Sequence, residues 1–126
     1  MIRWVLDASA LVDLLVVEGP RARLREALRF DRCATPEFMD LDATAVLTRL
    51  VAGGALPEAE AAQVLRDVRA APVQRCPHRP LMARAWSIRE RTGACAAAYL
   101  ALADVLGVPL LTSDPRLAEA YYDTRW

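Results

Sequence analysis

The chain has 126 residues, of which 55% are hydrophobic and 25% charged, and its formal net charge at pH 7 is zero. This composition is typical of a globular protein, and we expect a single domain over residues 1–126. Every basic residue is arginine, which excludes a Walker phosphate loop and a receiver-type phosphoacceptor pocket, since both require lysine. There is no apolar run of roughly 18 residues and no signal peptide, so we expect a cytoplasmic protein without a membrane span.

Short apolar segments of β character alternate along the chain with longer helical ones. A strand over residues 4–6 is followed by a helix that starts at the turn Asp7-Ala8-Ser9. The further elements that we expect are a helix over 20–28, a strand over 32–35, helices over 36–51 and 57–69, a strand over 73–75, helices over 80–91 and 95–106, a strand over 109–112, and a last short helix from Asp114.

Strands that alternate with helices predict right-handed crossovers and a parallel sheet covered on both faces. The expected fold class is therefore α/β, a three-layer α/β/α domain. Its central sheet would have four strands, or five if residues 123–126 add an edge strand. The helical spacing of Trp86, Tyr99 and Leu102 favours core packing for their side chains.

Three aspartates fall where such a sheet binds ligands, off the carboxyl ends of its strands. Asp7 ends the first strand and Asp114 follows the fourth by two residues, while Asp42 lies inside the helix after Pro36. Each aspartate alone is more often a helix cap than a ligand. Together they predict one acidic site.

The cysteines and the histidine offer no competing site. Cys33, Cys76 and Cys95 are far apart and form no CxxC pair, which argues against a disulfide framework or a zinc site. His78 is the only histidine, and no Gly-x-Ser-x-Gly elbow accompanies it, so a serine or cysteine triad is not supported.

Three segments together resemble the PIN-domain nucleases, most closely the VapC-type toxins of bacterial toxin-antitoxin pairs. They are Val5-Leu6-Asp7-Ala8-Ser9-Ala10, the stretch from Thr35 to Asp42, and Tyr99-Leu100-Ala101-Leu102-Ala103 leading into Leu111-Thr112-Ser113-Asp114. The resemblance covers essentially the whole chain. Members of the family commonly have Asp-Ala-x-Tyr before the Ala-Leu-Ala run. Here Tyr99 aligns, and Ala96 stands where the family has the aspartate.

The resemblance implies a metal-dependent endoribonuclease, because Mg²⁺ or Mn²⁺ held by carboxylates can activate water and neutralise charge on a phosphodiester. It makes Asp7 a direct metal ligand and Asp114 a residue that completes the site or positions water. Ala96 then marks the absent central ligand. Asp42 replaces the family's usual glutamate, which is longer by one methylene, so whether it reaches the metal directly or through water stays open.

Two hydroxyl residues, Ser9 and Thr112, are expected to support the site by orienting Asp7 or Asp114, or by contacting a phosphate oxygen. A helix cap for Ser9 and a strand-end turn for Thr112 are equally good interpretations.

Ala96 has two explanations. It is either an engineered replacement of the catalytic aspartate, which would make a toxic ribonuclease easier to produce, or the mark of a natural, weakened member of the family. We favour the first, because Tyr99 and the Ala-Leu-Ala run are intact. Either way we expect this chain to be nearly inactive.

The partners that the resemblance implies are an RNA substrate, a cognate VapB-like antitoxin and a second copy of the chain in a homodimer. The alternative function is a PIN-like module that binds RNA or antitoxin without cleaving.

Overall fold

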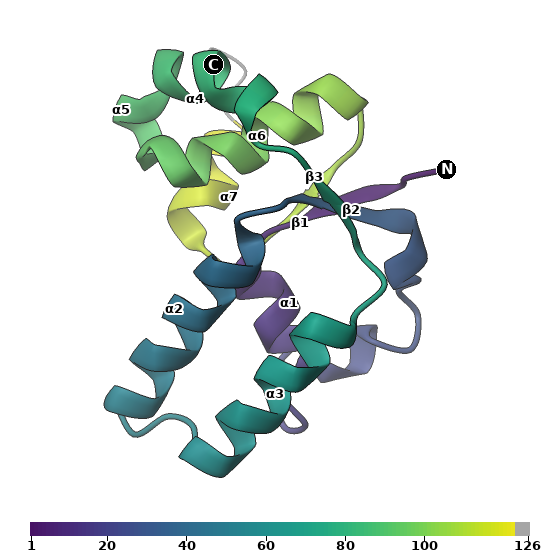
Figure 1. Ribbon diagram of the computed structural model, residues 1–126, viewed down its shortest axis with the longest axis vertical. Helices are drawn as coiled ribbons and strands as arrows, with labels where there is room; N and C mark the ends of the chain where they lie inside the picture. The colour runs from purple at the N-terminus through teal and green to yellow at the C-terminus, as the bar shows by residue number, and fades with distance from the viewer. Residues whose placement is uncertain (123–126) are drawn as a thin grey trace.

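The computed structural model describes residues 1–122, in which four strands form one parallel sheet in the order β3-β2-β1-β4 (Figure 1). The strands are β1 (Trp4–Leu6), β2 (Cys33–Pro36), β3 (Gln74–Cys76) and β4 (Leu110–Leu111). β1 lies in the centre, where Val5 is opposite both Ala34 and Leu110. The predicted parallel sheet is thus confirmed with four strands, while the fifth, over 123–126, lies outside the described residues.

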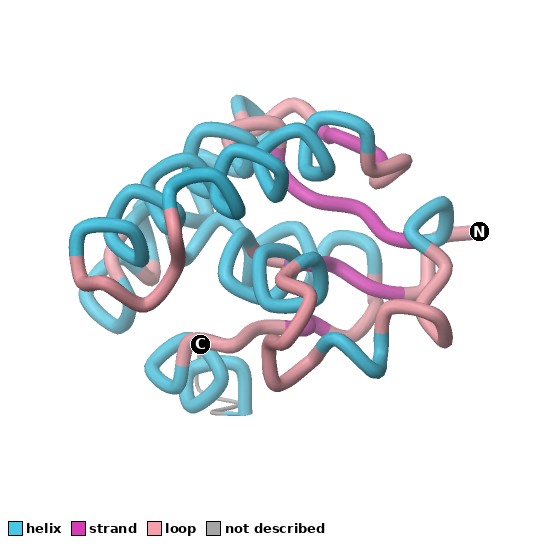
Figure 2. The backbone as a smooth tube through the Cα atoms, turned by 90° about the horizontal axis from the view of Figure 1, so that it is seen from below, coloured by secondary structure: helices cyan, strands magenta, loops and turns pink. Residues whose placement is uncertain are grey.

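Helices cover both faces of the sheet, as predicted. They are α1 (Ala8–Leu15), α2 (Met39–Ala52), α3 (Glu58–Ala70), α4 (Met82–Ser87), α5 (Arg89–Thr92), α6 (Ala94–Leu106) and α7 (Pro115–Tyr122). Figure 1 shows α1, α2 and α3 on one side of the strands and α4 to α7 on the other. Figure 2 shows the four strands running side by side.

The hydrophobic core is formed by apolar residues of β1, α1 and α6. Val5 and Leu6 of β1 are fully buried, as are Leu11 and Leu14 of α1. In α6 every residue from 97 to 103 is buried, and four of these are alanine, which lets the helix approach the sheet closely. Gly107 ends α6 in the left-handed conformation at φ 65°, which suits a residue without Cβ.

The structure corrects several predicted elements. The expected helix over 20–28 is only a 3₁₀ turn, Ala22–Leu24, with no buried residue, because the alternating arginines leave no apolar stripe to pack. Pro36 belongs to β2, and the following helix starts at Met39. The segment 80–91 is broken at Ile88 between α4 and α5.

Trp86 is a further correction, because its side chain does not pack in the core. It is 64% exposed on α4, and the guanidinium carbon of Arg89 lies 3.6 Å from the centre of the indole ring. Tyr99 and Leu102, by contrast, are buried. No helix among residues 1–122 has the length and apolarity needed to cross a membrane.

Thr35 ties β2 to the end of β1 and provides a test of the fold. It is fully buried, and its hydroxyl donates a 2.8 Å hydrogen bond to the carbonyl of Leu6. We expect Thr35→Val to lower the free energy of unfolding by about 1–2 kcal/mol, because the Leu6 carbonyl loses a buried donor. Urea denaturation measures this.

The matched control is Thr44→Val on α2, where an exposed hydroxyl donates to the Asp40 carbonyl. Its effect should stay within about 0.5 kcal/mol. Equal effects of the two substitutions would show that the buried bond does not stabilise the sheet.

Candidate active site

A cavity of about 440 Å³ lies off the carboxyl end of the sheet, and the predicted acids meet there. Its lining includes Asp7, Asp42, Asp114, Ser9 and Ala96. These side chains come from four elements: the β1–α1 junction, α2, α6 and the loop between β4 and α7. Thr112, the sixth predicted residue, is buried behind Asp7 and contacts it directly. The structure therefore brings all six predicted positions together.

Asp7 is the most buried of the acids, with 4% of its surface exposed. It caps α1, since its Oδ1 accepts a 2.8 Å hydrogen bond from the amide of Ala10. The hydroxyl of Ser9 donates to both carboxylate oxygens at 2.8 and 2.9 Å, and the hydroxyl of Thr112 donates to Oδ2. Asp7 is thus both the helix cap and part of the cavity wall.

Burial raises the pKa of Asp7, although the hydrogen bonds from Thr112, Ala10 and Ser9 oppose this shift. The negative charge of Asp42 raises the pKa further. The charges of Asp7 and Asp42 are therefore close enough to repel each other.

The loop that carries Asp114 is fastened to the same cluster. The amide of Ser113 donates to the Ser9 hydroxyl, and the amide of Asp114 donates to the Thr112 hydroxyl, each at 3.0 Å. Asp114 also begins α7, where its Oδ1 accepts a 3.0 Å hydrogen bond from the amide of Arg116. The hydroxyls of Ser9 and Thr112 therefore hold Asp114 at the cavity.

Asp42 has an unexpected partner in Tyr99. The Tyr99 hydroxyl donates a 2.7 Å hydrogen bond to Oδ2 of Asp42. The helical spacing of Tyr99 predicted its burial but gave no sign of this bond. Burial, together with the Asp42 charge, raises the pKa of the phenol, so Tyr99 remains a donor at neutral pH.

Ala96 is half-buried in the first turns of α6, three residues before Tyr99, and its methyl group forms part of the cavity wall. An acid at this position would therefore enter the same space as Asp7 and Asp42. The structure gives no account of why alanine stands here.

Two arginines were missed by the sequence analysis. Arg49 lines the cavity. It could have been predicted from the sequence, because it follows Asp42 by seven residues and so lies on the same helix face. Arg21 donates a 2.6 Å hydrogen bond to the Thr112 carbonyl. It lies in the segment wrongly predicted as a helix, and no sequence pattern indicated this contact.

The donor atoms suit a hard divalent cation, because the cavity offers carboxylate oxygens rather than thiolate or imidazole. Among residues 1–122, however, no three acidic, histidine or cysteine side chains are close enough to hold one metal ion. The carboxylate oxygens are thus of the kind that binds Mg²⁺, but with alanine at position 96 there are too few of them close together to hold the ion.

Comparison with known proteins agrees with this fold. The model of the PIN-domain family matches residues 4–121, so the chain belongs to the PIN-domain family. Within it, the chain is similar to VapC ribonucleases of Mycobacterium tuberculosis. It is 33% identical to ribonuclease VapC12 over 93% of this chain and 91% of that one. It is 37% identical to ribonuclease VapC3 over 93% and 86%.

Solved structures show the same fold. PAE2754 from Pyrobaculum aerophilum superposes with a TM-score of 0.73 at 22% identity, covering 96% of this chain and 81% of that one. VapC20 of M. tuberculosis, described as a sarcin-ricin loop cleaving toxin, superposes with a TM-score of 0.65 at 19% identity, covering 93% and 94%.

The raised pKa of Asp7 predicts a pH dependence of stability. Because its folded pKa lies above its unfolded value of 3.8, the native state binds the proton more readily than the unfolded chain. The free energy of unfolding should therefore fall as the pH rises from 3.8 through the folded pKa. Asp7→Asn should lose this part of the decrease, as measured by urea denaturation between pH 3.5 and 7.

Asp13→Asn, a half-buried position on the same helix, serves as the control. It should keep the slope of the parent chain. If Asp7→Asn keeps that slope too, burial of the Asp7 charge does not destabilise the fold at neutral pH.

Proposed function

We propose that the protein is a VapC-type toxin endoribonuclease whose acidic cavity hydrolyses RNA phosphodiester bonds with the help of a divalent cation. The observation that carries the proposal is the convergence of Asp7, Asp42 and Asp114 on one cavity in a PIN-domain chain. The VapC ribonucleases that are 33–37% identical to this chain support the reaction class.

Mg²⁺ or Mn²⁺ would be held by Asp7 and Asp114, together with an acid at position 96. When bound, the ion supplies a nucleophilic water and neutralises charge on the phosphate. The hydroxyls of Ser9 and Thr112 orient the Asp7 carboxylate, and the Thr112 hydroxyl holds the backbone of Asp114 by accepting a hydrogen bond from its amide.

Asp42 has a different part in this proposal. Tyr99 holds one of its oxygens and so fixes the carboxylate beside the cavity. An aspartate so fixed, and shorter than the glutamate usual in the family, would bind a water of the metal rather than the metal itself. Asp42 would then orient that water.

Ala96 limits what this chain does as it stands. Without a carboxylate there, metal affinity falls and the charge that develops on the phosphate is less well neutralised, so cleavage should be nearly lost. A chain that keeps the rest of the cavity could still bind RNA or an antitoxin. This binding module without cleavage is the second candidate function, favoured by the incomplete acid cluster.

The proposed partners are RNA, a VapB-like antitoxin and a second copy of the chain. On α4, Met82 is 61% and Trp86 64% exposed, and both line an apolar cavity of about 590 Å³. Apolar patches that are exposed in this way are typical of interaction sites. We propose that the homodimer forms through this patch.

The reaction is tested by placing an acid at position 96. Ala96→Asp should raise the rate of Mn²⁺-dependent cleavage of a labelled total RNA pool by about 100-fold or more, because a metal-binding charge needed in the transition state is added. EDTA should abolish the gain.

The matched control is Ala62→Asp, which adds the same charge at an exposed position of α3. It should leave the low cleavage rate of the parent chain unchanged. If Ala96→Asp, folded as judged by circular dichroism, cleaves none of the RNAs, the binding module is the better description.

Adding an acid also has a cost in the metal-free protein. A carboxylate at position 96 would join Asp7 and Asp42, which already repel each other. We therefore expect Ala96→Asp to lower the metal-free melting temperature by several degrees, equivalent to about 1 kcal/mol. Differential scanning calorimetry in EDTA measures this, and a melting temperature equal to that of Ala62→Asp would contradict it.

A further inference from the structure

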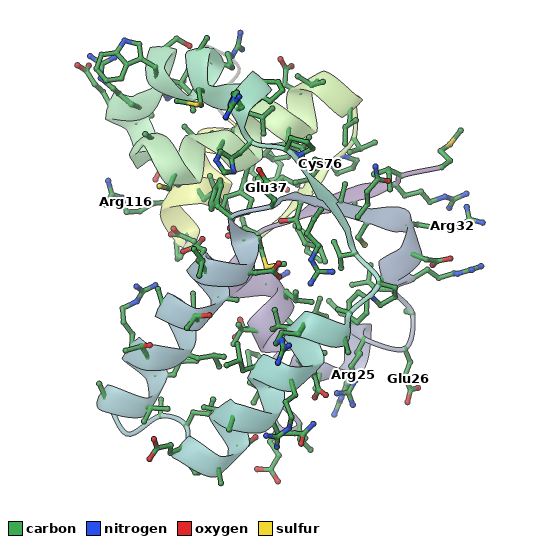
Figure 3. All side chains as sticks on the ribbon, viewed as in Figure 1. Arg25, Glu26, Arg32, Glu37, Cys76 and Arg116 are labelled. Atoms are coloured by element: carbon green, nitrogen blue, oxygen red, sulfur yellow. The ribbon has the colours of Figure 1, made fainter. Side chains whose placement is uncertain are left out.

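A second polar cavity, of about 320 Å³, lies at the amino end of the sheet, away from the acidic cavity. Its lining consists of Arg3, Trp4, Ala27, Leu28, Arg29 and Arg32. Figure 3 labels Arg32 on the side of the molecule where the chain begins, and Arg116, at the start of α7 beside the acidic cavity, on the other side. The two cavities thus lie at opposite ends of the strands.

The backbone holds two of these arginines together. Trp4 of β1 pairs with Cys33 of β2, so the residues just before them, Arg3 and Arg32, are neighbours. The amide of Arg3 also donates a 2.7 Å hydrogen bond to the carbonyl of Arg32. Both side chains line the same cavity, and like charges in such neighbouring positions repel each other.

Nearby acids do not balance this charge. Asp31 is paired with Arg29 through hydrogen bonds of 2.9 and 3.3 Å. These bonds are the main cause of the lowered pKa of Asp31, and the charge of Arg32 contributes less than they do. Arg3 and Arg32 make no side-chain hydrogen bond or ion pair with any residue from 1 to 122. Three arginines and one exposed acid leave the cavity with a net positive charge.

Trp4 gives the cavity an aromatic wall. Its indole is half-buried and continues the lining next to the arginines. Arginines match the oxygens of a phosphate, and an aromatic ring offers a base a surface on which to stack. The volume is at the lower end of the range for small-molecule sites, about 300–1,000 Å³.

We propose that this cavity is a nucleotide site, in which Arg3 and Arg32 bind a terminal 5′-phosphate and Trp4 contacts the base. The phosphate neutralises the charges of the two adjacent arginines, which form no ion pair with any residue from 1 to 122. A free mononucleotide and the 5′-end of an RNA share this chemistry. The site is independent of the metal and of RNA cleavage, so it stands or falls separately from the proposed function.

The test is isothermal titration of the full chain in EDTA with 5′-AMP, with adenosine, and with an RNA tetramer carrying either a 5′-phosphate or a 5′-hydroxyl. We expect the phosphate to strengthen binding at least about tenfold within one of these pairs, as charge-assisted hydrogen bonds would. A gain confined to AMP identifies free nucleotides, and a gain for the tetramer identifies an RNA end.

The double variant Arg3→Gln, Arg32→Gln should lose that gain, whereas Arg69→Gln, at an exposed position of α3, should keep it. Binding that is equal with and without the phosphate, or unchanged in the double variant, would overturn the proposal. So would hexaglutamate binding as tightly as AMP, since it would indicate an acidic peptide site. Both pairs, AMP with adenosine and the two tetramers, are measured on the unaltered chain, so equal binding within both pairs would overturn the proposal even if the double variant does not fold.

Discussion

The geometry of the acidic cavity depends on the hydrogen bonds to the buried carboxylate of Asp7. Burying a charged group to 4% exposure destabilises the fold unless donors surround it. Here the donors are the Ala10 amide and the hydroxyls of Ser9 and Thr112. The same two hydroxyls accept hydrogen bonds from the amides of the loop that carries Asp114. One carboxylate therefore caps α1, connects β1 to β4 and sets the position of a second acid.

Local patterns in the sequence were sufficient to predict the parallel sheet and to predict that the three aspartates lie close together. The apolar face of α1 follows from the periodicity of its sequence. Asp7 and Asp114 each come shortly after a strand, and parallel strands bring such residues to the same end of the sheet. The segment around Arg21 was predicted wrongly, because its alternating arginines leave no apolar stripe to pack. Its contact with Thr112 was missed, because it joins residues 91 positions apart. The Tyr99 hydroxyl was missed for a related reason: spacing indicates burial, but it does not identify a hydrogen-bond partner.

The three acids around Ala96 each have a partner in the protein. Asp7 has its three donors, Asp42 has Tyr99, and Asp114 has the amide of Arg116. These contacts do not require a carboxylate at position 96, which explains how the framework of the cavity persists around an alanine. What the fourth acid would add is affinity for a cation, and with it the charge neutralisation on which phosphodiester hydrolysis depends.

The most direct test of this account is the affinity for Mn²⁺, measured by isothermal titration for the chain as it stands, for Ala96→Asp, and for Ala96→Asp combined with Asp7→Asn. The account predicts that Ala96→Asp binds Mn²⁺ at least about tenfold more tightly than the parent chain, and that the added Asp7→Asn removes this gain. Equal affinities in the parent chain and Ala96→Asp, or a gain that survives Asp7→Asn, would contradict the assignment of this cavity as a metal site completed at position 96.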